Sequence, residues 1–535
     1  MTHETNRTFS REYKLTALRR MLAGENVSAL AHAGLLLVVL LLLLPPDGVL
    51  TDNEENYFQL AAQAVAGVPA APDSAVFDAS RHHFLSEMVL GRLITISGFE
   101  AAQIVTRALT AAAFALLLPP LLRLLSLSAL DGMIVVMVFA LLGQNLIGGE
   151  WLFRGFEAKI VAYGFVLAAL RAASARRSLV AATALCVAAT YFHFLVGVFW
   201  FFAVCGLRLI ENRRDIRRIA VAAIAFIVAT APLLGTIIRT RLSLDATGAA
   251  ADVPPPDVIY SLIREPWHGA PFLSWDYFAA QWLPGYLLAG AMLAGCIVIA
   301  RTSIAHTGID RAGNAARLRA FAEWLAMLIA YLFLMLVPSF VARHTGAIGK
   351  FYPFRPSSLV LLLWLALALA WLNGLVARHL LAVKLLALAL IAPAFLNAAV
   401  SRILGDQTYR TSFAADKEAV AGYLASNAAS DAVVLVDPAV EASFLDFERR
   451  VGRPSLVMWK FAPTNDPELR EWYRRVEFRK SLFERGCPPH LAYRVDFLLT
   501  TPGGVAALSP SCGPVVLESE HWRLLRRIAS GEGAE

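Results

Sequence analysis

The sequence predicts a polytopic α-helical membrane protein of about eleven transmembrane helices, followed by a small soluble α/β domain. The chain has 535 residues, of which 58% are hydrophobic and only 17% are charged, and its mean hydropathy is +0.58. A soluble protein of this size has about a quarter charged residues. Several runs also approach the roughly 20 apolar residues that are needed to cross a bilayer.

The expected domains are an N-terminal segment over 1–27, a transmembrane domain over 28–400 and a soluble domain over 405–535. The first segment is polar and basic, and the apolar run after it lacks the small-residue cleavage site of a signal peptide. We expect spans at 28–45, 101–120, 129–147 and 157–174, two within 178–210, and one each at 219–237, 281–300, 318–338, 357–376 and 380–400.

The stretch 178–210 is too long for one span and lies between two basic loops, at 171–177 and 208–218. A chain that leaves and re-enters on one side of the membrane must cross it an even number of times. We therefore expect two short spans, hinged near the sequence Tyr191-Phe192-His193-Phe194.

The charge distribution predicts the orientation. Residues 401–535 hold 17 Lys+Arg and 18 Asp+Glu, a net charge of about −1, so the rest of the chain carries about +8. Its basic residues cluster in short loops on the side of the N-terminus, which makes that side cytoplasmic and argues against a nucleic-acid footprint. The C-terminal domain is then outside, together with the loops 46–84, 148–156, 238–280 and 339–356.

The C-terminal domain combines helical and strand patterns. We expect helices at 415–426 and 466–485, and strands at 433–436, 455–458, 497–500 and 515–517. Cys487 and Cys512 lie in this region and could pair if it faces an oxidising compartment, which the sequence leaves open.

The outer loop 46–84 carries a first cluster of ionisable residues. Asp52, Glu54 and Glu55 lie within four residues, and His82-His83 follow where the chain re-enters the membrane. Three such carboxylates repel each other, and a partly buried site would raise one pKa or attract a cation. One of them could act as a general base. The alternative is a solvated helix N-terminus, where acidic side chains favour the helix dipole.

A second cluster lies where loop 148–156 enters the fourth span, with Glu150, Arg154, Glu157 and Lys159. Charges at membrane depth are costly unless they are paired or functional. Glu157 and Lys159 are two residues apart, so on a helix they would point to different faces, and at least one would need a partner elsewhere. An ion pair that only fastens two helices together is the alternative to a functional site.

Two further features lie on the outer side. His193 is at the tip of the two short spans, where packing is the commoner role of a lone histidine. Four basic residues precede the tenth span on the outer side, where the positive-inside rule predicts few of them: Arg343, His344, Lys350 and Arg355. Arginine forks suit phosphate oxygens, so a phosphate site is one explanation and interfacial anchoring is the other.

These features together resemble the GT-C superfamily of integral-membrane glycosyltransferases. The resemblance rests on the acidic first outer loop, the short spans around 178–210, Arg355 at the outer face and the soluble domain after the last span. It implies transfer of a sugar from a polyprenyl-phosphate carrier to an acceptor hydroxyl, in a single displacement on the non-cytoplasmic side. Asp52 would be the base, with Glu54 or Glu55 as rivals.

The same resemblance gives roles to the other residues. The acceptor or the sugar would be positioned by Glu150 and Glu157, together with Arg154, Lys159, His193 and His83. The lipid phosphate would be bound by Arg343, His344, Lys350 and Arg355. The chain lacks the WWD-type signature of oligosaccharyltransferases, which argues against transfer of whole oligosaccharides to Asn. It also lacks an Asp-x-Asp motif, so no cofactor is predicted with certainty. Whether the protein binds a divalent cation stays an open question.

Two other functions compete with this interpretation. A transporter or flippase for a lipid-linked sugar would need similar outer charges, although we find no internal repeat. A non-catalytic envelope-assembly protein would use the C-terminal domain for docking. The acceptor could be a lipid, a glycan or a protein. The composition, rich in Ala, Leu and Arg, suggests a bacterial inner membrane with the C-terminal domain in the periplasm.

Overall fold

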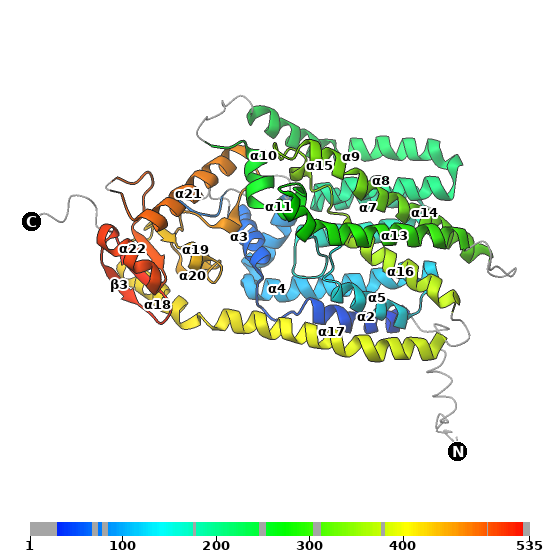
Figure 1. The fold of residues 1–535 in the computed structure, drawn as a ribbon, viewed down its shortest axis with the longest axis horizontal. Coiled ribbons are helices and arrows are strands. Elements are labelled where there is room, and N and C mark those ends of the chain that lie inside the picture. Colours follow the sequence, from blue (N-terminus) through cyan, green and yellow to red (C-terminus); the bar gives the residue numbers. More distant parts are fainter. Residues whose placement is uncertain are drawn as a thin grey trace, which may run out of the picture.

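The computed structural model describes residues 29–66, 73–77, 84–174, 178–244, 253–302, 312–375, 380–488 and 490–527. The predicted N-terminal segment 1–27 lies outside these ranges. Figure 1 shows a bundle of roughly parallel long helices with the C-terminal domain at one end. A small sheet lies in that domain, so the predicted fold class is confirmed.

Each of the eleven predicted spans coincides with a helix. These helices are α2 (Ala29–Leu43), α4 (Phe84–Leu122), α5 (Ala129–Leu141), α6 (Ala158–Ser174), α7 (Leu179–Phe192), α8 (Phe194–Glu211), α9 (Ile216–Leu244), α13 (Leu283–Thr302), α14 (Ala312–Leu334), α16 (Ser357–Leu375) and α17 (Leu380–Thr411). Within the described ranges, seven helices are long and apolar enough to cross a membrane, and three more are apolar but shorter. The number of crossings therefore stays a prediction.

The expected hinge between the two short spans lies at His193. α7 ends at Phe192 and α8 begins at Phe194, and His193 between them has extended backbone angles. A second break lies in α4 at Gly98, whose φ of +80° is in the region that favours glycine. This break separates a first, shorter helix from the predicted membrane span at 101–120.

Several short elements lie between the bundle and the C-terminal domain, among them α3, α10 and α11 (Figure 1). α3 spans Asp52–Ala66, α10 spans Pro256–Val258, a π-helical turn spans Ile259–Arg264 and α11 spans Pro266–Gly269. Three more short elements are continuous with bundle helices: α12 (Trp275–Tyr277) and a second π-helical turn (Phe278–Trp282) precede α13, and α15 (Leu336–Val341) follows α14. α3 packs closely on α4, because a Cβ atom on Gly91 would lie only 2.1 Å from a backbone oxygen of α3.

The C-terminal domain contains a four-stranded sheet of order β1-β2-β4-β3. β1 pairs with β2 in parallel, with Val434 opposite Phe497, and the other two pairings are antiparallel. The strands are β1 (Val434–Val436), β2 (Phe497–Thr500), β3 (Val515–Glu518) and β4 (Arg523–Arg526), and the helices are α18 (Ala414–Asn427), α19 (Pro438–Glu441), α20 (Phe447–Val451), α21 (Asp466–Arg485) and α22 (Pro502–Cys512). Cys487 and Cys512 form a disulfide.

Two details of this domain differ from the sequence prediction. The expected strand at 455–458 is reduced to one bridge between Ser455 and Val434, in which Val434 donates to Pro454 and Leu456 donates to Val434, and the chain turns into a short 3-10 helix at Trp459. β4 was not expected, and it fills the centre of the sheet between β2 and β3.

Candidate functional site

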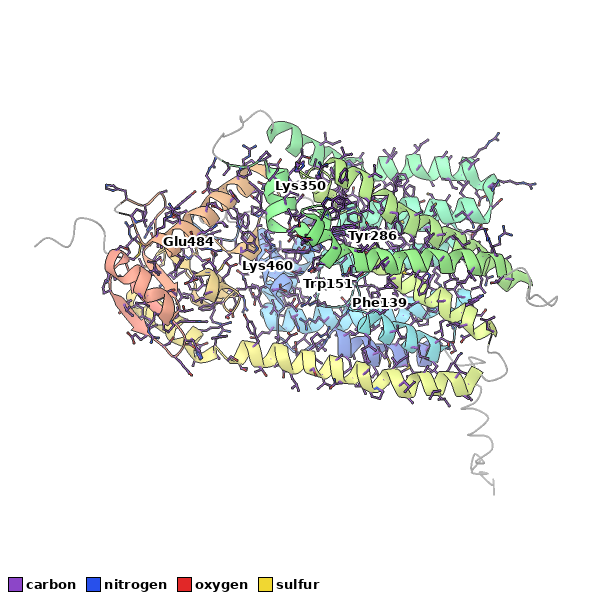
Figure 2. All side chains as sticks on the ribbon, in the orientation of Figure 1. Phe139, Trp151, Tyr286, Lys350, Lys460 and Glu484 are labelled. Atoms are coloured by element: carbon purple, nitrogen blue, oxygen red, sulfur yellow. A yellow bond between two sulfur atoms is a disulfide. The ribbon has the colours of Figure 1, made fainter. Side chains whose placement is uncertain are left out.

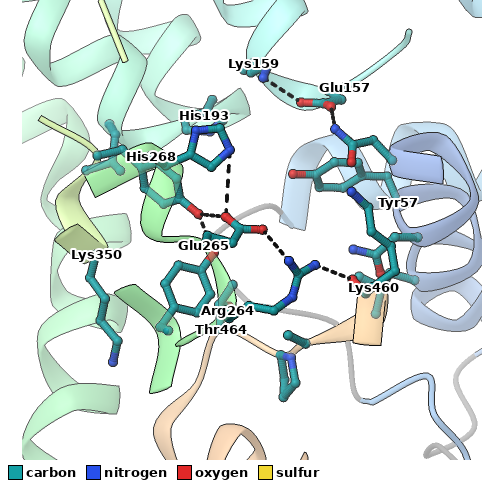
Figure 3. A pocket seen from close by; sticks show the side chains of 18 of the residues that line it. Tyr57, Glu157, Lys159, His193, Arg264, Glu265, His268, Lys350, Lys460 and Thr464 are labelled. Atoms are coloured by element: carbon teal, nitrogen blue, oxygen red, sulfur yellow. Dashed lines mark hydrogen bonds and ion pairs between the residues drawn. The ribbon is translucent and has the colours of Figure 1, made fainter. Parts of the chain in front are cut away.

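A cavity of about 500 Å³ lies where the helix bundle meets the C-terminal domain. In Figure 2, Lys350, Lys460 and Trp151 lie near this junction, and Figure 3 shows the cavity from close by. All four predicted outer loops contribute to its wall, together with the α7–α8 hinge and residues 460–468 of the C-terminal domain. The structure thus brings together chain segments that are far apart in the sequence.

The three acidic residues of the first loop form the first turn of α3, but they do not share one environment. Asp52 lies 3.1 Å from Lys460, Glu54 pairs with Arg107, and Glu55 lies 2.6 Å from Arg449. Each carboxylate has its own cation, which relieves their mutual repulsion. The alternative of a solvated helix end does not describe Glu54 and Glu55, because both are buried.

Of these three acidic residues, Asp52 lines the cavity. Its side chain is 61% exposed, whereas that of Glu54 is fully buried. Glu54 accepts hydrogen bonds from Arg107 Nε at 2.8 Å, from Arg107 Nη2 and from the backbone amides of Thr51 and Phe156. Its oxygens are therefore occupied in holding α3, α4 and the loop 148–156 together.

Lys460 controls the ionisation of Asp52. Partial burial in the cavity wall raises the pKa of Asp52, but the charge of Lys460 and its hydrogen bond outweigh this effect and lower the pKa below its usual value. Asp52 is therefore a carboxylate near neutral pH. Nothing in the sequence pattern of the C-terminal domain singled out Lys460, because its partner is more than 400 positions away along the chain.

The second predicted cluster is also assembled at the cavity. Lys159 Nζ lies 3.2 Å from both Glu150 and Glu157 and 4.0 Å from the centre of the Trp151 ring. Lys159 and Glu157 can meet because Glu157 precedes the first residue of α6 and is not held on a helical face. Glu157 also accepts a hydrogen bond from Asn53 of α3, the expected partner from elsewhere in the fold.

Arg355 lies deeper in the wall, with its side chain 13% exposed. Its Nε atom donates to Glu150 at 3.0 Å, its Nη1 atom lies 2.5 Å from His193 Nε2, and its guanidinium lies 4.0 Å from the centre of the Tyr352 ring. Burial raises the pKa of Glu150, but the charges of Arg355 and Lys159 outweigh burial and lower it to about 2. His193 is thus a contact of Arg355 as well as a hinge residue.

Loop 238–280 supplies a polar group that the sequence analysis missed. Glu265 lies 3.3 Å from Arg264 and accepts a hydrogen bond from the hydroxyl of Tyr352, as Figure 3 shows in part. The Nδ1 atom of His268 donates a hydrogen bond to the carbonyl oxygen of Gly148 at 2.7 Å, and the His268 ring lies near Glu265 as well. The run Arg264-Glu265-Pro266-Trp267-His268, charged residues beside aromatic ones in an outer loop, was the available signal.

Burial raises the pKa of Glu265, but His268 and Arg264 outweigh it, so the net pKa lies below the usual value. Tyr352 has a φ of +44°, an unusual value for a residue with a side chain. Its hydroxyl is 2.8 Å from that of Tyr260, and these contacts hold it in place. Strained backbone of this kind is found preferentially at functional sites.

The remaining predicted residues are spread more widely. Lys350 lines the cavity, where it binds Asp257 at 2.8 Å and Asp466 at 2.6 Å. Arg343 lines a different, small pocket and stacks on Phe340, and His344 is exposed. The structure does not bring Arg343 and His344 to the main cavity wall, and His83 lies outside the described residues.

Arg154 differs from the other cations of the cavity wall. Lys159, Arg264, Lys350, Arg355 and Lys460 each pair with at least one carboxylate. Arg154 is exposed, and among the residues that the structure describes it has neither an ion-pair partner nor a hydrogen bond. Its charge is therefore available to an anionic ligand.

A metal site was left open by the sequence. Over the described ranges, no three or more His, Cys, Asp or Glu side chains are grouped so that they could hold a metal ion.

Comparisons with known proteins give limited information. A family model described as a domain of unknown function (DUF6798) matches residues 415–478, within the C-terminal domain. No curated protein matches the sequence. Two crystal structures of ArnT from Cupriavidus metallidurans, one bound to undecaprenyl phosphate and one in the apo state, are similar over 95% of this chain and 99% of theirs, at 14% identity. Their TM-scores are 0.37 and 0.36, so the functional argument rests on the cavity itself.

Proposed function

We propose that the protein is a membrane glycosyltransferase that moves a sugar from a polyprenyl-phosphate carrier to an acceptor hydroxyl. The observation that carries the proposal is the placement of Asp52, an ionised and accessible carboxylate in the wall of a cavity at one end of the membrane helices. The cavity is large enough for a sugar, since ligand pockets generally measure about 300–1,000 Å³.

In this mechanism Asp52 accepts the proton of the acceptor hydroxyl while the hydroxyl oxygen attacks C1 of the sugar. The bond between C1 and the phosphate oxygen breaks, and its electron pair leaves with the lipid phosphate. Lys460 contacts one carboxylate oxygen of Asp52, at 3.1 Å, and this exposed side chain keeps further lone pairs that can accept the hydroxyl proton. The cations of the wall favour the charge that develops on the phosphate.

The polar groups around Asp52 suggest how the substrates are held. Glu157 supplies a carboxylate and Asn53 a side-chain amide to the cavity wall, which Trp151 also lines. Tyr57 and Trp267 add further aromatic surface. Sugars combine hydroxyl groups with apolar faces, so such a wall suits them. Glu54 and Glu55 act as structural ion pairs in this proposal.

The disulfide supports the proposed orientation. A disulfide between Cys487 and Cys512 forms and persists in oxidising compartments such as the bacterial periplasm. The C-terminal domain and the adjoining cavity would then face the periplasm, and the N-terminus would face the cytoplasm.

The test is sugar transfer by the purified full chain in nanodiscs, with a panel of radiolabelled polyprenyl-phosphate sugars and a crude envelope extract as acceptor. We expect labelled product with the wild type and none with Asp52→Asn. The matched control is Asp431→Asn, because Asp431 is also an exposed aspartate with a single arginine partner, but lies outside the cavity. If the protein bound the donors without consuming them, the proposal of a glycosyltransferase would be wrong and a transporter would be favoured.

A further inference from the structure

A second cavity of about 400 Å³ adjoins the first and has a different wall. The ends of α2 and α5 and the middle of α17 supply apolar side chains, including Leu43, Leu141 and Phe395. The two cavities share Gly149, Trp151 and Arg154. The second cavity thus leads from the polar site toward the membrane helices.

Two arginines mark the polar end of this second cavity. Arg154 has no ion-pair partner among the described residues, and Arg402 of α17 also lines the cavity. Arg402 donates to the carbonyl oxygens of Leu42 and Leu43, at 3.1 and 2.7 Å, and has no carboxylate within ion-pair distance in the described part of the chain. Two cations therefore lie beside an apolar wall, and neither has a carboxylate within ion-pair distance among the described residues.

A third observation concerns Asn145, which lines the same cavity. Its Oδ1 atom is buried and has no hydrogen-bond partner among the described residues. The oxygen and nitrogen of a side-chain amide have nearly the same shape, so rotating the Asn145 amide would present a donor to the cavity in place of an acceptor. Glu150 also lines the cavity, but its carboxylate is occupied by Arg355 and Lys159.

We propose that the second cavity binds the isoprenoid chain of the carrier lipid and that Arg154 and Arg402 bind its phosphate. This rests on the proposed function, and it moves the phosphate site away from Lys350 and Arg355, whose charges are already paired. A phosphate at Arg154 lies on the boundary of the two cavities, so the attached sugar would project into the one that Asp52 lines.

Charge complementarity favours this occupant. An amphiphile with one anionic head and a long apolar tail matches two unpaired arginines above an apolar wall. The arginines would also favour the lipid phosphate after sugar transfer, since its negative charge increases when the bond to C1 breaks.

The test measures lipid binding by the purified full chain in detergent, by native mass spectrometry, independently of sugar transfer. The probes are a long-chain polyprenyl monophosphate, the matching polyprenol and phosphatidylglycerol. We expect the polyprenyl monophosphate to bind best and Arg154→Gln to weaken its binding about tenfold or more. A tenfold loss corresponds to about 1.4 kcal/mol, and a hydrogen bond to a charged group contributes at least that much. Arg154 is exposed and makes neither an ion pair nor a hydrogen bond within the described residues, so this variant should fold normally.

A second variant tests the apolar wall. Ala398 lines the cavity and is exposed, so Ala398→Trp should fill the space and weaken binding of the same lipid. Its matched control is Ala389→Trp, because Ala389 is also exposed on α17 but lies nine residues away, on about the opposite face of the helix. Ala389→Trp should bind the lipid as the wild type does.

The outcomes separate this inference from the proposed function. Unchanged binding in both Arg154→Gln and Ala398→Trp would overturn the inference, even if transfer still required Asp52. Equal binding of phosphatidylglycerol would also overturn it, since the cavity would then be a general site for anionic lipids. Specific binding that both variants weaken would support it, even if no sugar transfer were found.

Discussion

Replacing Glu54 by glutamine is expected to destabilise the protein far more than replacing Asp52 by asparagine. Glu54 is fully buried, pairs with Arg107 and accepts two backbone amides. Glutamine keeps the shape of the side chain but leaves the buried charge of Arg107 with only its longer ion pair, to Asp47 at 3.4 Å. Removing one partner of a buried ion pair costs about 3–5 kcal/mol.

Asp52 gives the contrasting case. Its side chain is 61% exposed, and its ion pair with Lys460 is a single contact at 3.1 Å. Exposed ion pairs contribute about 0–1 kcal/mol. Asp52→Asn should therefore leave the free energy of unfolding within about 1 kcal/mol of the wild type. According to the proposed function, it should nevertheless abolish sugar transfer.

The assay combines denaturant unfolding of the purified variants in detergent with the transfer measurement described above. Asp431→Asn is the control for both readouts. A Glu54→Gln variant that unfolds at the wild-type midpoint, yet has no transfer activity, would refute the reasoning. Glu54 would then be the base, and the cavity wall would have been assigned to the wrong acidic residue.

Three further predictions concern other contacts. Lys460→Met should raise the pKa of Asp52, since Lys460 lowers it; the acid limb of the pH profile of kcat/KM should then move to higher pH, and an unchanged limb would contradict Asp52 as the base. Cys487→Ser should reduce the free energy of unfolding by about 3 kcal/mol, because the disulfide to Cys512 closes a loop of 25 residues; unfolding under non-reducing conditions measures this, with reduced wild type as control. Gly91→Ala should separate α3 from α4, because its Cβ atom would lie 2.1 Å from a carbonyl oxygen; retention of full activity and stability would contradict this packing.

The membrane part of the fold was largely predictable because its signal is local. Each span is a continuous apolar run, and basic loops at 171–177 and 208–218 were enough to predict the hinge at His193. The helix over 466–485 was equally clear, since Pro467 lies in its first turn. β4 was missed because Arg523–Arg526 has charged ends and only two apolar residues, and it depends on its neighbouring strands.

The candidate site was predictable only in part. Local sequence indicated Asp52, Glu150 and Arg355 as residues at the outer ends of spans, and the structure places all three in or beside one cavity wall. Their partners come from distant positions, so the sequence could not show that Glu54 is occupied by Arg107 or that Lys460 meets Asp52. Which carboxylate is accessible is a property of tertiary packing.

The length of α17 has a further consequence. Its 32 residues span about 48 Å at 1.5 Å per residue, whereas the hydrocarbon core of a bilayer is about 30 Å thick. The helix therefore extends well beyond the bilayer and leads directly to α18, so it sets the height of the C-terminal domain above the lipid surface. The same domain is also fastened to α3 by the ion pair of Arg449 with Glu55, and to loop 339–356 by that of Asp466 with Lys350, both at 2.6 Å. The position of Lys460 relative to Asp52 of α3 is therefore set by two kinds of restraint, the length of α17 relative to the bilayer and these ion pairs.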